Sequence, residues 1–126
     1  MPTRVALIAE AVEDLTGYAR SGNLLLFLKK LVRLEQVGED AGLPLRRDLA
    51  GYRKIVVGDR DWRIVFRMSE DGQTAFVVVV GDRDDAACYE IASRRIERYQ
   101  GSLPADFSLA EAMLQLMQSG KRPRPG

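Results

Sequence analysis

The sequence predicts an α+β fold centred on a small, mostly antiparallel four-stranded sheet. Two observations indicate this class. Residues 53–80 contain three strand-like segments joined by short turns, and connections this short join antiparallel neighbours. Apolar residues recur at helical spacing before and after this stretch. We therefore expect an N-terminal helical hairpin, a helix after the last strand and an extra C-terminal helix around the sheet.

Length and composition narrow the class of protein. The chain has 126 residues, enough for one domain with its own hydrophobic core. Its one cysteine, Cys88, excludes an intrachain disulfide and fits a reducing compartment. We expect this cysteine to be a small core side chain. The longest apolar runs are far too short to span a bilayer, so we expect a soluble, cytoplasmic protein without a membrane partner.

The chain contains no histidine, so it lacks the commonest acid–base side chain and the commonest metal ligand. A single cysteine also rules out a zinc site made of thiolates. We therefore expect neither a metal nor a cofactor. The formal net charge is only +1, so a surface that binds phosphate has to be local, with its cations gathered on one face.

Two predicted helices follow a short predicted strand at residues 4–8. The first helix spans residues 9–19, and the second spans residues 23–37 and ends at Gly38. The apolar residues of the second helix cover an arc of about 180°, wider than a surface helix needs. They are Leu24, Leu25, Phe27, Leu28, Leu31, Val32 and Leu34. Either this helix is wedged between the sheet and the first helix, or part of the arc is exposed for a partner protein.

Three further strands are expected at residues 53–57, 62–68 and 75–80. The second of them alternates cleanly, with Trp62, Ile64, Phe66 and Met68 on one face and Arg63, Val65 and Arg67 on the other. The third is apolar at every position, which is typical of a central strand covered on both faces.

A helix is expected from Asp84 or Asp85 to about Gln100, because either aspartate can cap its start. Its apolar stripe consists of Tyr89, Ala92, Ile96 and Tyr99. Its arginines Arg94, Arg95 and Arg98 are expected to be solvated.

The chain after residue 100 is predicted to be an extension. Residues 101–107 form a linker, and an S-x-x-E capping box, Ser108 to Glu111, begins a helix over 108–119. A helix this short is not stable alone in water, so it must dock. It packs near the 23–37 helix or across the functional face, or it is a fixed core helix. The basic, Pro-rich residues 121–126 are predicted to be disordered.

Four cations are spaced so that several can share one side of the sheet, namely Lys54, Arg63, Arg67 and Arg83, and Tyr89 follows closely on the next helix. A one-sided cluster of cations with a phenol suits phosphate chemistry on a nucleic acid. Each residue alone also has a structural explanation. An arginine on a strand is often solvated or salt-bridged, Arg83 has aspartates beside it, and Tyr89 fits the apolar stripe of its helix.

The segments LAGYRKIVVGDRDWRIVFRM and VVVVGDRDDAACYEIASRRI resemble the RelE/ParE superfamily of toxins, and more the RelE branch than the ParE branch. The resemblance covers about residues 4–98. It implies a toxin domain at 1–100 followed by the extension at 101–126. It also implies a type II toxin that cleaves mRNA in the ribosomal A site and is neutralised by a cognate antitoxin.

Carried over residue by residue, the resemblance assigns catalysis to Lys54, Arg63, Arg83 and Tyr89. The family often has a second lysine two residues after the first, and Val56 stands there in this chain. We expect Arg53, Arg60 and Arg67 to supply the missing charge as RNA-binding residues.

RNA cleavage without metal or histidine uses the 2′-hydroxyl of the substrate as nucleophile. Arg63 and Arg83 suit the stabilisation of the phosphorane, because guanidinium forks match phosphate oxygens. Lys54 or Tyr89 transfers the proton, and Tyr89 alternatively stacks on a base. Two other functions remain open: a ParE-like inhibitor of DNA gyrase without catalysis, which Val56 favours, and an inactive relative that acts as a protein-binding module.

Overall fold

The computed structural model describes residues 3–19, 23–58, 62–82 and 85–120. In chain order the elements are β1 (Arg4–Leu7), α1 (Ala9–Ala19), α2 (Leu24–Val37), the 3-10 helix η1 (Gly38–Ala41), β2 (Leu43–Pro44), the 3-10 helix η2 (Arg47–Leu49), β3 (Tyr52–Val57), β4 (Trp62–Met68), β5 (Thr74–Asp82), α3 (Asp85–Arg98), β6 (Phe107–Ser108) and α4 (Leu109–Gly120). The predicted disordered tail at 121–126 lies outside the described residues.

The strands form one mixed sheet in the order β2-β3-β4-β5-β1-β6. The β1–β5 pair is parallel and the other pairs are antiparallel. The α+β class is confirmed, but the expectation of four strands was wrong, since the described residues contain six. The two additional strands, β2 and β6, are two residues long each and lie at the two edges of the sheet. Segments this short show no periodicity in a sequence, and Pro44 fits an edge because it has no N–H to donate.

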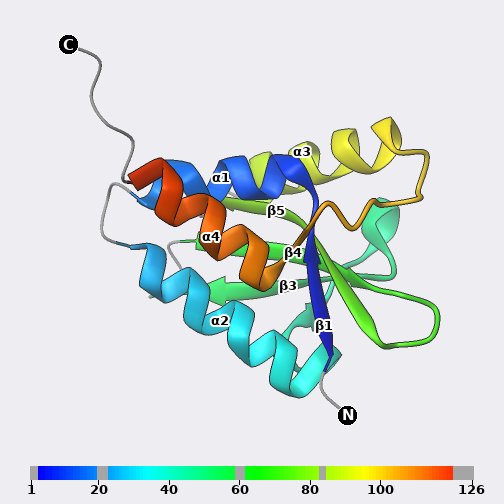
Figure 1. Ribbon diagram of the computed structural model, residues 1–126. Coiled ribbons are helices and arrows are strands. Elements are labelled where there is room, and N and C mark those ends of the chain that lie inside the picture. The colour runs from blue at the N-terminus through cyan, green and yellow to red at the C-terminus, as the bar shows by residue number, and fades with distance from the viewer. Residues whose placement is uncertain (1–2, 20–22, 59–61, 83–84, 121–126) are drawn as a thin grey trace.

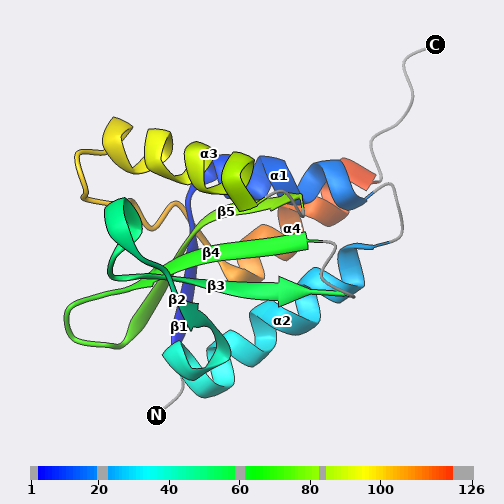
Figure 2. The same cartoon turned by 180° about the vertical axis from the view of Figure 1, so that it is seen from behind.

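The helices cover the two faces of the sheet unequally. In Figure 1, α1, α4 and α2 lie in front of the sheet, and in Figure 2 the molecule is seen from behind with α3 on the opposite side. The main core lies under the three helices of the first face, where Phe27, Leu31 and Leu34 of α2 are fully buried. Tyr18, Phe27 and Trp62 form an aromatic cluster there, with the Phe27 and Trp62 rings 5.6 Å apart.

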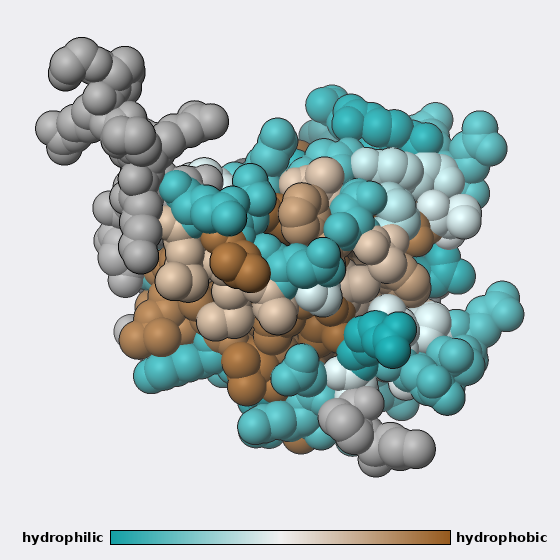
Figure 3. All heavy atoms as spheres, viewed as in Figure 1, coloured by the Kyte–Doolittle hydropathy of each residue, from teal (hydrophilic) through white to brown (hydrophobic). Residues whose placement is uncertain are grey.

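The apolar arc of α2 is partly buried and partly exposed. Its inner residues are wedged against the sheet, whereas Leu25 is 61% exposed. Apolar side chains gather over α2 and α4 in the space-filling view of Figure 3. Leu24 and Leu28 of α2 and three residues of α4 line a groove of about 120 Å³ between the two helices.

The C-terminal segment is part of the same fold. The predicted capping box is confirmed, because the Ser108 N–H donates to Glu111 (2.9 Å) and the Glu111 N–H donates to the Ser108 hydroxyl (3.1 Å). Strand β6 pairs with β1, and α4 packs on α1 and β1 with Ala112 and Leu116 buried. Helix α4 is therefore a fixed core helix that also lies beside α2, and it is on the face opposite α3.

Side chains of α1 and α3 meet at the edge of β5, beyond the point where β1 ends. The β4–β5 register shifts between Val65 and Phe66, so that Val78 has no partner on β4. Strand β1 pairs with β5 only as far as Val77. The outer edge of β5 is then completed by side chains: the Val80 N–H donates to Asp14 of α1 (3.0 Å) and Arg95 of α3 donates to the Val78 carbonyl (3.0 Å).

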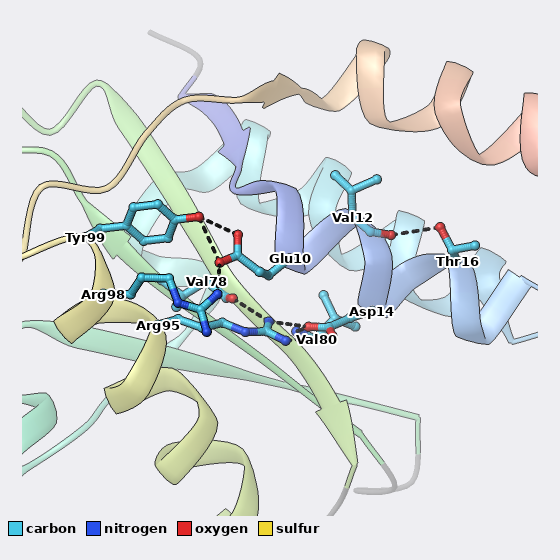
Figure 4. A network of polar contacts seen from close by, with 9 residues as sticks. All are labelled: Glu10, Val12, Asp14, Thr16, Val78, Val80, Arg95, Arg98 and Tyr99. Carbon is cyan, nitrogen blue, oxygen red and sulfur yellow. Dashed lines mark hydrogen bonds and ion pairs between the residues drawn. The ribbon is translucent and has the colours of Figure 1, made fainter.

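Arg95 is therefore not solvated, and that prediction was wrong. Its side chain is 16% exposed and donates to both carboxylate oxygens of Asp14, at 2.7 and 3.0 Å (Figure 4). Burial alone would lower the pKa of Arg95, but the hydrogen bond and charge of Asp14 outweigh it and raise that pKa. The partner is 81 residues away in the sequence, so the helix pattern alone gave no sign of it.

A second group of polar contacts lies beside this ion pair. The Tyr99 hydroxyl donates to the Glu10 carboxylate, with distances of 2.6 and 2.8 Å to its two oxygens, and Arg98 donates to it at 3.1 Å. The hydrogen bond to Glu10 raises the pKa of Tyr99. Burial opposes ionisation of Glu10, but the bond from Tyr99 and the nearby arginines lower its pKa on balance. We call Glu10, Asp14, Arg95, Arg98 and Tyr99 the α1–α3 network (Figure 4).

Candidate functional site

Lys54 and Tyr89 meet on the face of the sheet that α3 covers. Lys54 lies on β3 and Tyr89 lies one residue after the buried Cys88 of α3. The Lys54 ammonium nitrogen is 5.9 Å from the centroid of the Tyr89 ring, within the range of a cation–π contact. The structure thus brings together a cation and a phenol that are 35 positions apart, by their residue numbers.

Arg63 belongs to the same face. Lys54 is in register with Val65, and Arg63 is in register with Val56, so Arg63 is a diagonal neighbour of Lys54 at about 7–8 Å between backbones. Arg63 is only 8% exposed, and its guanidinium donates to the Trp62 carbonyl (3.0 Å). The sheet surface at this site therefore contains a nearly buried arginine whose position is fixed by packing.

Gly81 lets α3 approach the sheet at this site. It is in register with Arg63 on β5, and a Cβ atom there would lie 3.2 Å from the Cys88 sulfur and 3.4 Å from a Val79 methyl carbon. Cys88 is 2% exposed, which confirms the expectation of a core side chain. The close contact between Gly81 and Cys88 fixes the height of Tyr89 above the strands.

Two of the predicted RNA-binding arginines have other contacts. Arg67 is on the Lys54 face, but its guanidinium lies 5.6 Å from the Tyr52 ring centroid and donates to the Gly101 carbonyl (3.3 Å). Arg53 is on the opposite face, where it donates to the Gly42 carbonyl (3.1 Å) and forms an ion pair with Glu39 (3.7 Å). Arg60 and Arg83 lie outside the described residues.

Sequence reasoning missed two cations beside Tyr89. Arg46 and Arg47 line a surface pocket of about 200 Å³ together with Tyr89. The only signal in the sequence is a pair of adjacent arginines in the predicted loop before the first arginine-bearing strand. That signal does not show which face of the molecule the loop reaches.

No helix within residues 3–19, 23–58, 62–82 and 85–120 is long and apolar enough to cross a membrane. In the same ranges, no three histidine, cysteine, aspartate or glutamate side chains lie close enough together to hold a metal ion.

No protein-family model matches the chain, and no curated protein matches it. Among solved structures it is similar to a chain of the toxin–antitoxin complex RelBE2 from Mycobacterium tuberculosis, with 25% identity and a TM-score of 0.56 over 65% of this chain and 99% of that one. A mutant of the E. coli toxin RelE in the free state has 21% identity and a TM-score of 0.60 over 76% of this chain and 99% of that one. The YoeB/ParE toxin from Agrobacterium tumefaciens has 19% identity and a TM-score of 0.54, covering 64% and 98%.

These likenesses define the class of the protein. The fold is that of the small α+β toxins of toxin–antitoxin systems. In fold, the chain is similar to the RelE, YoeB and ParE toxins named among these structures.

Proposed function

We propose that the chain is the toxin of a type II toxin–antitoxin pair and cleaves mRNA on the ribosome without a metal ion. The observation that carries this proposal is the contact between Lys54 and Tyr89 beside Arg63, because it gathers a cation, a phenol and a guanidinium over one patch of the sheet. The site contains no carboxylate among its predicted members, and its chemistry suits a polyanion. We also propose residues 1–100 as the toxin unit and residues 101–126 as an addition, since the similar structures cover 64–76% of this chain.

The proposed reaction is an internal transesterification of RNA. The 2′-oxygen attacks the adjacent phosphorus, the bond from phosphorus to the 5′-oxygen breaks, and the products carry a 2′,3′-cyclic phosphate and a 5′-hydroxyl. Lys54 or Tyr89 accepts the 2′-hydroxyl proton, and a proton is returned to the leaving 5′-oxygen. Arg63 and Arg83 stabilise the charge of the pentacovalent phosphorane, because their guanidinium groups stay charged and fit phosphate oxygens.

The charge around the reacting phosphate is proposed to come from Arg60 and Arg67, which stand in for the lysine replaced by Val56. Arg67 can do so only if it leaves the Gly101 carbonyl. The ion pair of Arg53 with Glu39 on the opposite face supports a structural part for that residue instead.

The test is primer extension on a reporter mRNA after brief induction of the wild type, of Arg83→Ala and of Tyr89→Phe. Codon-spaced 5′-hydroxyl ends that depend on translation and vanish with Arg83→Ala would support the endonuclease. Tyr89→Phe separates its two possible roles: cleavage is lost if the hydroxyl transfers a proton and kept if the ring only stacks. Intact mRNA in arrested cells would reject the endonuclease.

A second candidate is a ParE-like inhibitor of DNA gyrase that performs no catalysis. Val56 favours it, because its half-buried aliphatic side chain stands where the RelE pattern has a lysine. Growth arrest with intact mRNA and damaged DNA would select this function. Neither mRNA cleavage nor growth arrest would leave an inactive protein-binding module.

The proposed partner is a cognate antitoxin, and the groove between α2 and α4 supports it. Leu25, Leu114 and Met117 beside this groove are 56–61% exposed, an apolar surface that Figure 3 shows to be continuous over both helices. Met117→Lys is expected to weaken antitoxin binding without unfolding the chain, as measured by calorimetry. Unchanged affinity would place the antitoxin elsewhere.

A further inference from the structure

The pocket beside Tyr89 lies between η2 and α3, two elements that pack on each other. It is lined by Arg46, Arg47, Leu49, Tyr89, Glu90 and Ser93, and we call it the Arg46–Arg47 pocket. Its volume of about 200 Å³ is smaller than that of a pocket for a drug-sized ligand. It therefore suits one phosphate with part of a sugar or base, not a large folded ligand.

The Arg46–Arg47 pocket carries an excess of positive charge. Both arginines are exposed, and within residues 3–19, 23–58, 62–82 and 85–120 no ion pair or side-chain hydrogen bond engages either guanidinium. The one lining carboxylate, Glu90, is paired with Arg94 at 2.5 Å. Because that pair neutralises Glu90, an anion in the pocket meets two guanidinium groups with little opposing charge.

The backbone at Arg47 is held in an uncommon conformation. Its φ angle is 57°, in the left-handed region that is unfavourable for a residue with a side chain. The turn is kept in place by the burial of Leu49 and by hydrogen bonds from the Leu49 and Ala50 N–H groups to the carbonyls of Arg46 and Arg47. Strain of this kind persists where the surrounding structure imposes it, and it often marks functional positions.

Tyr89 connects this pocket to the proposed catalytic patch. Its ring faces the Lys54 ammonium at 5.9 Å and is also a wall of the Arg46–Arg47 pocket. Proteins that bind single-stranded nucleic acid combine an aromatic ring, on which a base stacks, with cations along the phosphate backbone. Lys54, Tyr89 and the two arginines contain both parts of that arrangement, with Tyr89 between the cations.

We propose that the Arg46–Arg47 pocket binds the nucleotide next to the cleaved bond of a single-stranded RNA, with its phosphate on the two guanidinium groups and its base or ribose against Tyr89. This inference rests on the proposed function, since it identifies a neighbouring subsite of the same RNA. It assigns to Arg46 and Arg47 the RNA contact that Arg53, with its own partners on the opposite face, does not supply.

The test is a titration of the full chain, followed by the NMR signals of its backbone amides, with a non-cleavable 2′-O-methyl tetranucleotide up to millimolar concentration. Shifts are expected at Arg47, Leu49, Tyr89 and Ser93 of the pocket, together with shifts at Lys54 and Arg63 of the proposed catalytic patch. The dissociation constant is then measured against salt for the wild type and for Arg46→Gln/Arg47→Gln. Loss of two phosphate contacts should make the slope of log K against log salt shallower by about 1.4, that is about 0.7 for each contact.

A matched control is Lys29→Gln/Arg33→Gln, which removes the same charge from exposed positions of α2. It should leave the slope within error of the wild type. Shifts absent from the pocket at millimolar oligonucleotide, or equal slopes for the two double variants, would overturn the inference. Codon-spaced mRNA cleavage in the primer-extension test would still support the proposed function in that case, and pocket binding by a chain that cleaves no mRNA would reject the function alone.

Discussion

Two regions around α3 contain arginines and a tyrosine but differ in their charge partners. At 3.6 residues per turn, Arg95 and Arg98 lie on one side of α3 and Tyr89, Glu90 and Ser93 on another, and Tyr99 follows directly after the helix. On the first side, arginines meet the carboxylates of α1 in the α1–α3 network. On the second side, Tyr89 stands among Lys54, Arg46 and Arg47.

The difference lies in what the topology brings opposite each cation. Asp14 accepts a hydrogen bond from the edge of β5 beyond Val77, where β1 no longer pairs, and it also pairs with Arg95. Arg95 therefore has an opposite charge and hydrogen-bond acceptors within reach. Among the residues that line the Arg46–Arg47 pocket, the one carboxylate, Glu90, is already paired with Arg94. Cations that are paired with carboxylates stabilise the fold. Cations that gather on one face in excess of carboxylates repel one another, which lowers stability, and they attract an anion. Variants on the two sides should therefore separate stability from activity.

The largest expected effect is on activity. Lys54→Met keeps the aliphatic stem over Tyr89 and removes the charge, so it should lower mRNA cleavage on programmed ribosomes by about 100-fold or more, the range of one acid–base or charge-stabilising group. Loss of its cation–π contact should lower the free energy of unfolding by only about 0.5–1 kcal/mol. Lys29→Met on the exposed surface of α2 is the control and should cleave normally. A Lys54→Met variant that cleaves at the wild-type rate would exclude Lys54 from the site.

The next effect is on stability. Asp14→Ala leaves the Arg95 guanidinium and the Val80 N–H without their partner. It should lower the free energy of unfolding by about 2–3 kcal/mol. This loss is smaller than for a completely buried charge, because both side chains keep some exposure. Urea unfolding followed by circular dichroism measures it. Arg94→Ala, which breaks the exposed pair with Glu90, should cost less than about 0.5 kcal/mol. Equal losses for the two variants would contradict the structural importance of the network.

The same comparison shows how far the sequence predicts the fold. Strands β3 and β4 and the four helices have a clear period, and β5 is an apolar run bounded by turn residues; the predicted ranges of all of them agree with the structure within one or two residues. Strands β2 and β6 have two residues each, too few for a period to appear. Their pairing depends on partners far along the chain, which local patterns do not show.

The same limit holds for side-chain contacts: local patterns predict those that depend on local geometry and miss those between distant segments. Alternation along β3 and β4 predicted the shared face of Lys54 and Arg63, because strand geometry is local. Nothing local distinguished Arg95, which is buried against Asp14, from Arg94, which is exposed. The local sequence pattern also did not show that Arg46 and Arg47 lie beside Tyr89. The chemical roles of Lys54, Arg63, Arg83 and Tyr89 remain predictions for the experiments above.

Glu10 and Tyr99 should give the network a recognisable dependence on pH. The pKa of Glu10 is lowered by folding, so its stabilising contribution is complete above the unfolded value of about 4.5 and is lost as the pH falls through the folded value. The pKa of Tyr99 is raised, so its contribution is complete below about 10 and is lost at higher pH. Tyr99→Phe should cost about 1 kcal/mol at pH 7 and flatten both ends of the curve of unfolding free energy against pH. A parallel curve, merely displaced, would mean that other groups cause the dependence.

The smallest loss of stability is expected for Arg98→Ala. This variant tests whether an arginine of α3 stabilises the fold through burial of its ion pair or through the ion pair alone. Arg98 and Arg95 both contact a carboxylate of α1, but the Arg98 side chain is 67% exposed and that of Arg95 is 16% exposed. Water and salt screen the Arg98–Glu10 contact, so Arg98→Ala should cost less than about 0.5 kcal/mol, and the loss should fade further in 1 M salt. Urea unfolding at low and high salt measures it beside Asp14→Ala, whose larger loss should persist at high salt. If Arg98→Ala cost as much as Asp14→Ala, charge pairing without burial would be enough to hold α1 against α3.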